Sequence, residues 1–440
     1  MPSGPSSATR SIFGVILKDD GSPGVNREFV KFWLGQSVSM LGNQFTLLAL
    51  PIAAAVTLRA TPLEMGLLGA MRFAPAILFG LPAGVWLDRT RRKPTMVVSQ
   101  VLSAVALATI PAAALFHVLT IGQLYIAAFV AGAAATVQGI ALPSIVPALA
   151  GRDRLVQANT RIQSSLTVSN LVGPGMAGAA VQALTAPVAI AFDALSFVVG
   201  AVTTARTRLE ESLPSAARRR SFADAVEGQV WMWRQPLVRA ISLTILINNC
   251  GGNVIFAVYV LYFVARVGIT PAQIGLIFAV GGATALLGAQ LGRPLIARGW
   301  LGPVMAVGAT LVVLGQSGAL IAAYAPREAV FPILIAFSAL LGCALMLYNV
   351  NQQSIRQAVT PDHLLGRVQS GIYVLVAVAA VAGSLLGGAI GQSVGLRAAL
   401  AVGVGLNLVS ALPSIFSPLR RLRSVPIPEP DARSVTPARI

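Results

Sequence analysis

Twelve long apolar segments dominate this chain, and each approaches the roughly 20 residues that a helix needs to cross a bilayer. They are expected near residues 30–57, 63–86, 94–116, 121–147, 163–183, 187–205, 238–264, 272–296, 302–324, 328–350, 368–391 and 396–416. Only 11% of the 440 residues are charged, whereas a soluble protein carries about 25%. The sequence therefore predicts an all-α membrane protein with twelve transmembrane helices.

The two halves of the chain repeat one another. The pair Gly80-x-x-x-Gly84 recurs as Gly288-x-x-x-Gly292, and the glycines of 173–178 recur in 383–388 at nearly the same spacing. Parallel six-helix repeats are typical of transporters that rock two halves about a central site. We expect two pseudo-symmetric six-helix bundles, 30–205 and 238–416. The remaining parts are a cytoplasmic N-terminal segment (1–29), a central cytoplasmic loop with an amphipathic helix (206–237) and a disordered, Pro-rich cytoplasmic tail (417–440).

The net charge of +17 is distributed unevenly between alternate connections. One set of loops contains Arg59, Arg266, Arg327 and Arg397, Arg72 lies inside an apolar segment, and all other Lys and Arg lie in the opposite set or in the tails. By the positive-inside rule, both termini are cytoplasmic. The basic face then meets anionic lipid head groups, so we expect membrane lipids and no nucleic acid as partners. Arginine far outnumbers lysine, as in GC-rich bacteria, which favours a bacterial inner membrane; we expect a monomer.

The loop after the second segment contains a cluster of charges that begins at a carboxylate. Residues 84–93 read Gly-Val-Trp-Leu-Asp-Arg-Thr-Arg-Arg-Lys. A carboxylate at Asp88 can cap a neighbouring helix, where the macrodipole favours negative charge at the N-terminus. The pattern resembles motif A of the major facilitator superfamily, although Arg91 replaces a glycine of that motif. The resemblance implies a conformational latch, made by Gly84, Asp88, Arg89 and Arg92, that joins the two halves on the cytoplasmic side.

Other stretches resemble the drug-exporter branch of this superfamily, which includes enterobactin and macrolide efflux proteins. They are 157–159, Gly173-Pro174, Asp193–Phe197 and Thr360–Val368. The resemblance implies export of a drug, antibiotic, siderophore or other natural product. We expect Gly173, Pro174 and Gly178 to bend the fifth helix, unless these residues only allow close packing.

Two charges lie inside apolar segments, Arg72 in the second and Asp193 in the sixth. An unpaired charge within a bilayer costs several kcal/mol, so we expect the two to pair or to face water. Asp193 is a candidate acid for proton coupling. Alternatively, it holds the sixth helix in place through hydrogen bonds, and the sequence leaves both roles open.

Polar amides recur in the first, fourth, seventh and tenth segments, which line the central path in the superfamily. The predicted substrate cavity contains Gln36, Asn43, Gln44, Gln138, Asn248, Asn249, Asn253, Asn349, Gln352 and Gln353. Together they favour a cavity with neutral, hydrogen-bonding walls that suits amphipathic cargo. Taken singly, each amide is as well suited to hold two helices together.

The motifs exclude two other classes of protein. No lysine follows a glycine, so the phosphate-binding loop of an ATP-driven pump is missing. No cluster of His, Asp or Glu indicates an enzyme or a metal site, and no cofactor is expected. We predict a secondary active exporter of hydrophobic or amphipathic small molecules that works by alternating access and proton antiport. A lipid flippase or non-drug scaffold is the alternative, and a metabolite importer ranks lowest.

Overall fold

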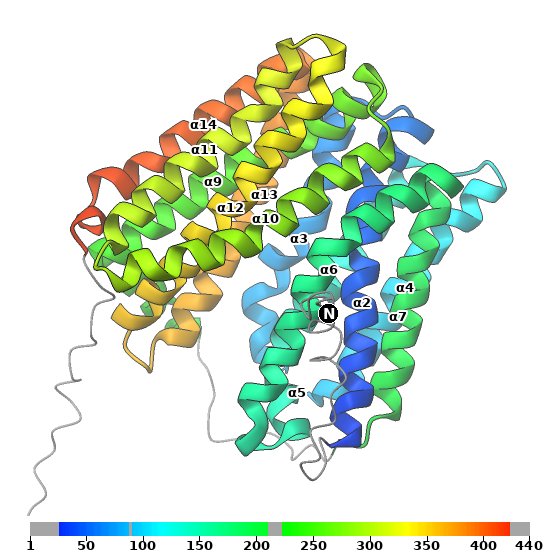
Figure 1. Cartoon of the computed structure of the whole chain (residues 1–440). Coiled ribbons are helices and arrows are strands. Elements are labelled where there is room, and N and C mark those ends of the chain that lie inside the picture. Colours follow the sequence, from blue (N-terminus) through cyan, green and yellow to red (C-terminus); the bar gives the residue numbers. More distant parts are fainter. Residues whose placement is uncertain (1–25, 88–89, 210–221, 423–440) are drawn as a thin grey trace, which may run out of the picture.

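The computed structural model describes residues 26–87, 90–209 and 222–422, and every regular element within them is a helix. The first bundle contains α2 (Arg27–Ile52), α3 (Pro62–Leu87), α4 (Arg92–Leu115), α5 (Ile121–Ala150), α6 (Leu155–Leu184) and α7 (Ala186–Arg206). The second contains α9 (Pro236–Val260), α10 (Pro271–Ala297), α11 (Leu301–Tyr324), α12 (Arg327–Val359), α13 (Leu365–Ser393) and α14 (Leu396–Phe416). The predicted fold of two six-helix bundles is confirmed (Figure 1).

Within the described ranges, eleven helices are long and apolar enough to cross a membrane. The remaining bundle helix is α6, whose first half is polar and contains Gln157, Asn159 and Arg161. At about 1.5 Å per residue, a helix of this length exceeds the roughly 30 Å hydrocarbon core, so its polar turns can lie outside that core. The same reason explains why α12 continues to Val359, beyond the predicted end at 350.

The two bundles contact each other along two helix pairs, α3 with α13 and α6 with α10 (Figure 1). A Cβ added at Gly66 on α3 would lie 2.8 Å from the Cα of Gly388 on α13. A Cβ added at Gly178 on α6 would lie 2.9 Å from the Cα of Gly275 on α10. Small residues allow such close approach of transmembrane helices. Because α10 repeats α3 and α13 repeats α6, the second contact is the pseudo-symmetric copy of the first.

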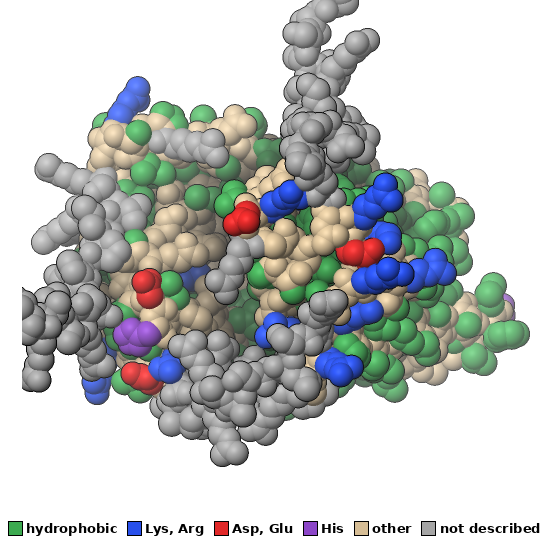
Figure 2. Space-filling view, turned by 90° about the horizontal axis from the view of Figure 1, so that it is seen from below, with side chains coloured by type: hydrophobic (Ala, Val, Ile, Leu, Met, Phe, Trp, Pro, Cys, Tyr) green, Lys and Arg blue, Asp and Glu red, His purple; other side chains and the backbone are tan. Residues whose placement is uncertain are grey.

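These glycine contacts lie near the end of the molecule opposite the described chain ends, in the first turns of α3 and the last turns of α6. At the same end, α2 and α9 continue into two π-helical segments, η1 (Ala53–Thr57) and η3 (Leu261–Val267), which contact each other. Figure 2 looks onto the other end, where Lys and Arg side chains gather and the surface between the halves is hollowed. The structure therefore has a closed end and a basic, open end.

The central loop contains α8 (Phe222–Arg234), which packs against α13. Arg367 on α13 forms an ion pair with Glu227 on α8. Met232 is fully buried, and Trp231 packs against the same core, whereas Trp233 stays exposed. An amphipathic helix is therefore present, and its Trp231 contacts protein.

The predicted disordered tail begins too early. Ser417–Leu422 are ordered: η4 (Pro418–Arg421) follows α14, and Leu419 is fully buried. The amide N–H of Gly302 donates to the carbonyl of Leu422 at 2.8 Å. Burial of one leucine and a backbone hydrogen bond hold this short stretch on α11, and residues 423–440 lie outside the described part.

Candidate transport site

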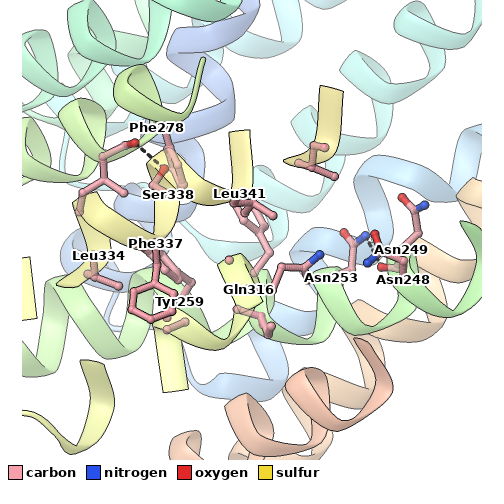
Figure 3. A pocket seen from close by; sticks show the side chains of 18 residues that line it. Asn248, Asn249, Asn253, Tyr259, Phe278, Gln316, Leu334, Phe337, Ser338 and Leu341 are labelled. Atoms are coloured by element: carbon pink, nitrogen blue, oxygen red, sulfur yellow. Dashed lines mark hydrogen bonds between the residues drawn. The ribbon is translucent and has the colours of Figure 1, made fainter. Parts of the chain in front are cut away.

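A cavity of about 340 Å³, which we call the amide pocket, lies inside the second bundle (Figure 3). Helices α9, α10, α11 and α12 surround it. Three asparagines of α9, Asn248, Asn249 and Asn253, line one part together with Gln316 of α11. None of its lining residues carries a charge. A pocket of this size is at the lower end of those that hold drug-sized ligands.

Local hydrogen bonds orient the asparagines of α9. The side-chain amide of Asn249 donates to the carbonyl of Ile245 at 2.8 Å, and that of Asn253 donates to the carbonyl of Asn249 at 2.9 Å. One of the two N–H groups of each amide is thus used within the helix, and the side-chain oxygens accept no hydrogen bond from a described residue. The pocket therefore offers hydrogen-bond acceptors to a ligand that carries N–H or O–H groups.

Aromatic rings form the opposite part of the amide pocket. Phe256, Tyr259, Phe278 and Phe337 line it, and Tyr259 stacks on Phe278 with ring centroids 5.9 Å apart. Ser338 stands between the rings, where its hydroxyl donates to the carbonyl of Ile277 at 2.7 Å (Figure 3). An apolar face opposite a polar face suits a compound that is itself amphipathic.

A second cavity, of about 190 Å³, lies between the two halves, and we call it the arginine pocket. Asn43, Thr46 and Arg72 line it from the first bundle, and Tyr373 and Ser384 from α13 of the second. Phe256 lines both this cavity and the amide pocket. The two pockets are therefore neighbours that share one aromatic wall.

The two pockets occupy pseudo-equivalent places in the repeat. Leu47, Leu50, Gly69 and Ala128 line the arginine pocket, and Phe256, Tyr259, Phe278 and Phe337 line the amide pocket at one constant spacing further along the chain. At the same spacing, Arg72 corresponds to Gly281. The repeat has thus kept both cavities and changed the side chains that line them.

Arg72 and Asp193 do not form an ion pair. No pair within 4.0 Å joins them in the described ranges. Arg72 is exposed to the space inside the molecule, and its guanidinium carbon lies 5.6 Å from the ring centroid of Phe73. Asp193 is fully buried between α7 and α2. Of the two alternatives that we left open for these charges, a direct ion pair is not formed, and Arg72 faces a cavity instead.

Asp193 is held by short-range contacts within the first bundle. Its Oδ1 accepts from the hydroxyl of Ser196 at 3.0 Å, and a Cβ added at Gly42 would come within 2.7 Å of the same oxygen. The hydroxyl of Thr46 lies beside this carboxylate. Neither that hydroxyl nor the other carboxylate oxygen forms a hydrogen bond of normal geometry with a described residue. This arrangement combines a packing role with an oxygen that remains free to bind a proton.

Several amides predicted for the cavity are bonded to other side chains, two of them between helices and one within α12. Gln36 is buried and donates to Thr204 at 3.4 Å, and Gln44 donates to Asn170 of α6 at 2.8 Å. Gln352 is buried and accepts from Arg356 at 3.1 Å. None of the three lines the amide pocket or the arginine pocket, and a place for them in a substrate cavity stays a prediction. The half-buried Gln138 and the exposed Gln353 line neither pocket, and Asn349 lines a small cavity of about 40 Å³ beside Asn248 and Asn249.

The predicted latch is described only in part. Asp88 and Arg89 lie outside the described residues, and Gly84 lies in a stretch of α3 whose side chains are not described. Arg92 donates to the carbonyl of Ser144 at 3.4 Å and so joins the start of α4 to α5. Whether this cluster acts as a latch stays a prediction.

The residues predicted to bend α6 lie at close contacts with other helices. The helix continues through Pro174 without a break. A Cβ added at Gly173 would come within 2.4 Å of the side chain of Gln44 on α2, and Gly178 meets α10 as described above. Both glycines therefore serve close helix contacts, and Pro174 brings its carbonyl near Gly275.

The sequence did not point to Gln316 or to the aromatic residues of the amide pocket. The prediction placed the cavity between the first, fourth, seventh and tenth spanning helices, and α11 is not one of them. A lone glutamine between Gly315 and Gly318 in an otherwise apolar helix was the available signal. Its side-chain oxygen accepts a hydrogen bond from Asn407 of α14, which leaves its amide group facing the pocket.

Comparisons with known proteins agree on the class of protein. A family model described as Major Facilitator Superfamily matches residues 32–298 and 241–439. The multidrug efflux pump Tap of Mycolicibacterium fortuitum is 24% identical over 87% of this chain and 93% of its own. The enterobactin exporter EntS of Salmonella typhi is 26% identical over 80% of this chain and 83% of its own. The structure of a bacterial homologue of the iron transporter ferroportin, in an inward-facing state, matches with TM-score 0.71 and 14% identity, over 89% of this chain and 99% of that chain, which shows a shared fold.

Proposed function

Because the chain belongs to the Major Facilitator Superfamily, we propose that this multi-pass membrane protein is a secondary active exporter of hydrophobic or amphipathic small molecules. Its cargo is a drug, antibiotic, siderophore or other natural product. Relatives that are a multidrug efflux pump and an enterobactin exporter support export. The observation that carries the proposal is the pair of pseudo-equivalent cavities, one inside the second half and one between the halves, in a molecule whose halves are packed together at one end.

Alternating access follows from the symmetry of the contacts between the halves. The glycine pairs hold one end closed, and rocking about the pockets would open that end and close the basic end. In the second state, Gly84, Asp88, Arg89 and Arg92 would act as the latch. With both termini in the cytoplasm of a bacterium, the present structure faces inward, and anionic lipids surround the basic end of a monomer.

Proton antiport is assigned to Asp193. Among the described residues, it is the one carboxylate that is fully buried inside a membrane-spanning helix. One of its oxygens lacks a partner, and the adjacent Thr46 lines the arginine pocket. A proton gained or lost here would change the charge balance beside that pocket, where an unpaired charge is costly.

The test is transport by the full chain in liposomes with an imposed pH gradient and a panel of candidate compounds. The Asp193→Asn variant is expected to lose gradient-driven uptake into inverted vesicles and to retain substrate counterflow. Loss of both activities with poor expression would contradict the coupling role and leave a structural one. Uptake by the parent protein that is the same with and without the gradient would contradict proton antiport.

A susceptibility measurement separates the exporter from a flippase or scaffold. Expression in a pump-deficient bacterial host is expected to raise the inhibitory concentration of at least one transported compound. The Asp193→Asn variant, expressed at the same level, provides the control. A normal susceptibility profile together with lipid movement in liposomes would favour the flippase instead.

A further inference from the structure

The arginine pocket contains a cation whose charge no described carboxylate neutralises by contact. Arg72 lines this pocket and is exposed to it, and its one described close interaction is with the ring of Phe73. Asp193 lies in the interface of α2 and α7 and makes no ion pair with it. The two charges attract each other across the interior without touching. A cation with no anion in contact at this depth is costly, and an anion beside it would relieve the cost.

The chemistry of the two pockets is opposite although their places in the repeat are equivalent. The amide pocket has four aromatic rings where the arginine pocket has Leu47, Leu50, Gly69 and Ala128. The arginine pocket has a guanidinium where its counterpart has Gly281. At these equivalent positions the second half therefore supplies uncharged rings, and the first half supplies a single positive charge.

The shared wall at Phe256 makes these two pockets parts of one site. We infer that the cargo is an amphipathic acid: an uncharged, ring-bearing body lies in the amide pocket, and a single acidic group reaches Arg72. The inference rests on the proposed exporter function and names its substrate class. It departs from the neutral cavity that the amides alone predicted.

Hydrogen bonding narrows the class further. The side-chain oxygens of Asn249 and Asn253 are free to accept, and one N–H of each amide already donates to a carbonyl of α9. The body of the ligand should therefore carry N–H or O–H donors beside its rings. Arg72 would bind a carboxylate, sulfonate or phosphate oxygen through charge-assisted hydrogen bonds, which are stronger than those between neutral groups.

Two fluorescent dyes test the assignment because they differ in one group. 1-Anilinonaphthalene-8-sulfonate has aromatic rings, an N–H donor and a sulfonate, and N-phenyl-1-naphthylamine has the same skeleton without the sulfonate. Each is titrated against the full-length protein in nanodiscs, with empty nanodiscs as the blank. The parent protein is expected to bind the sulfonate dye about tenfold more tightly, which corresponds to about 1.4 kcal/mol.

Matched variants assign the preference to particular residues. Arg72→Gln is expected to abolish the preference for the sulfonate dye while leaving the affinity for the neutral dye unchanged, and Arg72→Lys should keep most of the preference. The control Arg266→Gln changes an exposed arginine near the closed end and should alter neither. Asn253→Leu should weaken both dyes by the same factor, whereas Gln392→Leu, at an exposed amide outside both pockets, should weaken neither.

Equal affinity of the parent protein for the two dyes would overturn the inference, as would an unchanged preference in a folded Arg72→Gln variant. Folding is checked by gel filtration and by the melting temperature of each variant. Failure of the proposed function looks different. A protein that binds the dyes as described but transports neither the sulfonate dye nor any panel compound would keep the site and lose the exporter. A protein that exports compounds but shows no preference for acids would keep the exporter function and contradict the inferred substrate class.

Discussion

A single methyl group at Gly388 should shift the protein away from the state described here. A Cβ at this position would lie 2.8 Å from the carbonyl oxygen of Pro62 and 2.9 Å from the Cα of Gly66, all across the interface between the halves. Both neighbours are backbone atoms, so no side-chain rotation relieves the contact. Overpacking of this kind costs about 1–3 kcal/mol.

That cost applies to one state of the equilibrium. The higher helix propensity of alanine, up to about 1 kcal/mol over glycine, acts on α13 whether the end is closed or open, and so cancels. The contact with Gly66 exists in the closed arrangement alone if the halves rock apart there. A penalty of about 1–3 kcal/mol would therefore shift the ratio of the two states by about 5- to 150-fold.

Distances between spin labels measure this shift. Labels at Phe116 and Val394, both strongly exposed near the closed end, report on that end. Labels at Val156 and Trp300 report on the basic end. Gly388→Ala should lengthen the first distance and shorten the second in a chain whose Cys250 and Cys343 are replaced by serine.

Two further variants make the experiment decisive. Gly178→Ala, at the pseudo-equivalent contact with Gly275, should produce the same shift. Gly405→Ala on α14 should produce none, since a Cβ there meets no atom within 4 Å. Unchanged distance distributions in both interface variants, each folded, would refute the reasoning that these glycines close one of two states.

Two more predictions concern the ends of the bundles. Asp88→Asn should slow transport while leaving membrane insertion intact, and normal turnover at normal expression would count against the latch. Leu419→Ala should lower stability by about 2–5 kcal/mol, because it empties a fully buried position, and this would be measured as a lower melting temperature in detergent. Phe416→Ala, at a position that is 75% exposed, is its control, and equal effects of the two would show that the ordered tail contributes nothing.

The fold was predictable because a bilayer imposes one length on every spanning helix. That constraint ends where a helix leaves the hydrocarbon. The predicted end of the tenth helix at 350 was therefore too early, since α12 continues to Val359 and Ile355 is fully buried. Leu419 was missed for a related reason. A single leucine beside arginines gives no periodic pattern, yet one buried side chain is enough to order a short segment against α11.

The types of residue at the site were predictable from the sequence, but the directions in which their side chains point were not. The sequence places Arg72 and Asp193 inside apolar segments, but a position along a helix does not tell which way the side chain points around the helix axis. Gly42 determines the direction of Asp193. Because Gly42 has no side chain, the Asp193 carboxylate on α7 can pack directly against α2. The same limit explains why Gln36 joins two helices while Asn253 faces a cavity.

Symmetry constrains the contacts between the halves more than it constrains the pockets. For two states to interconvert by rocking, the packing at each interface must be matched, and Gly66 with Gly388 is matched by Gly275 with Gly178. The interior is under no such demand, because a ligand contacts both halves at once and need not be symmetric. Ala128 could therefore diverge from Phe337, and Arg72 from Gly281, without disturbing the interfaces. Substitutions that exchange pocket residues between the halves should accordingly change which compounds bind and leave the distances between the labelled ends unchanged.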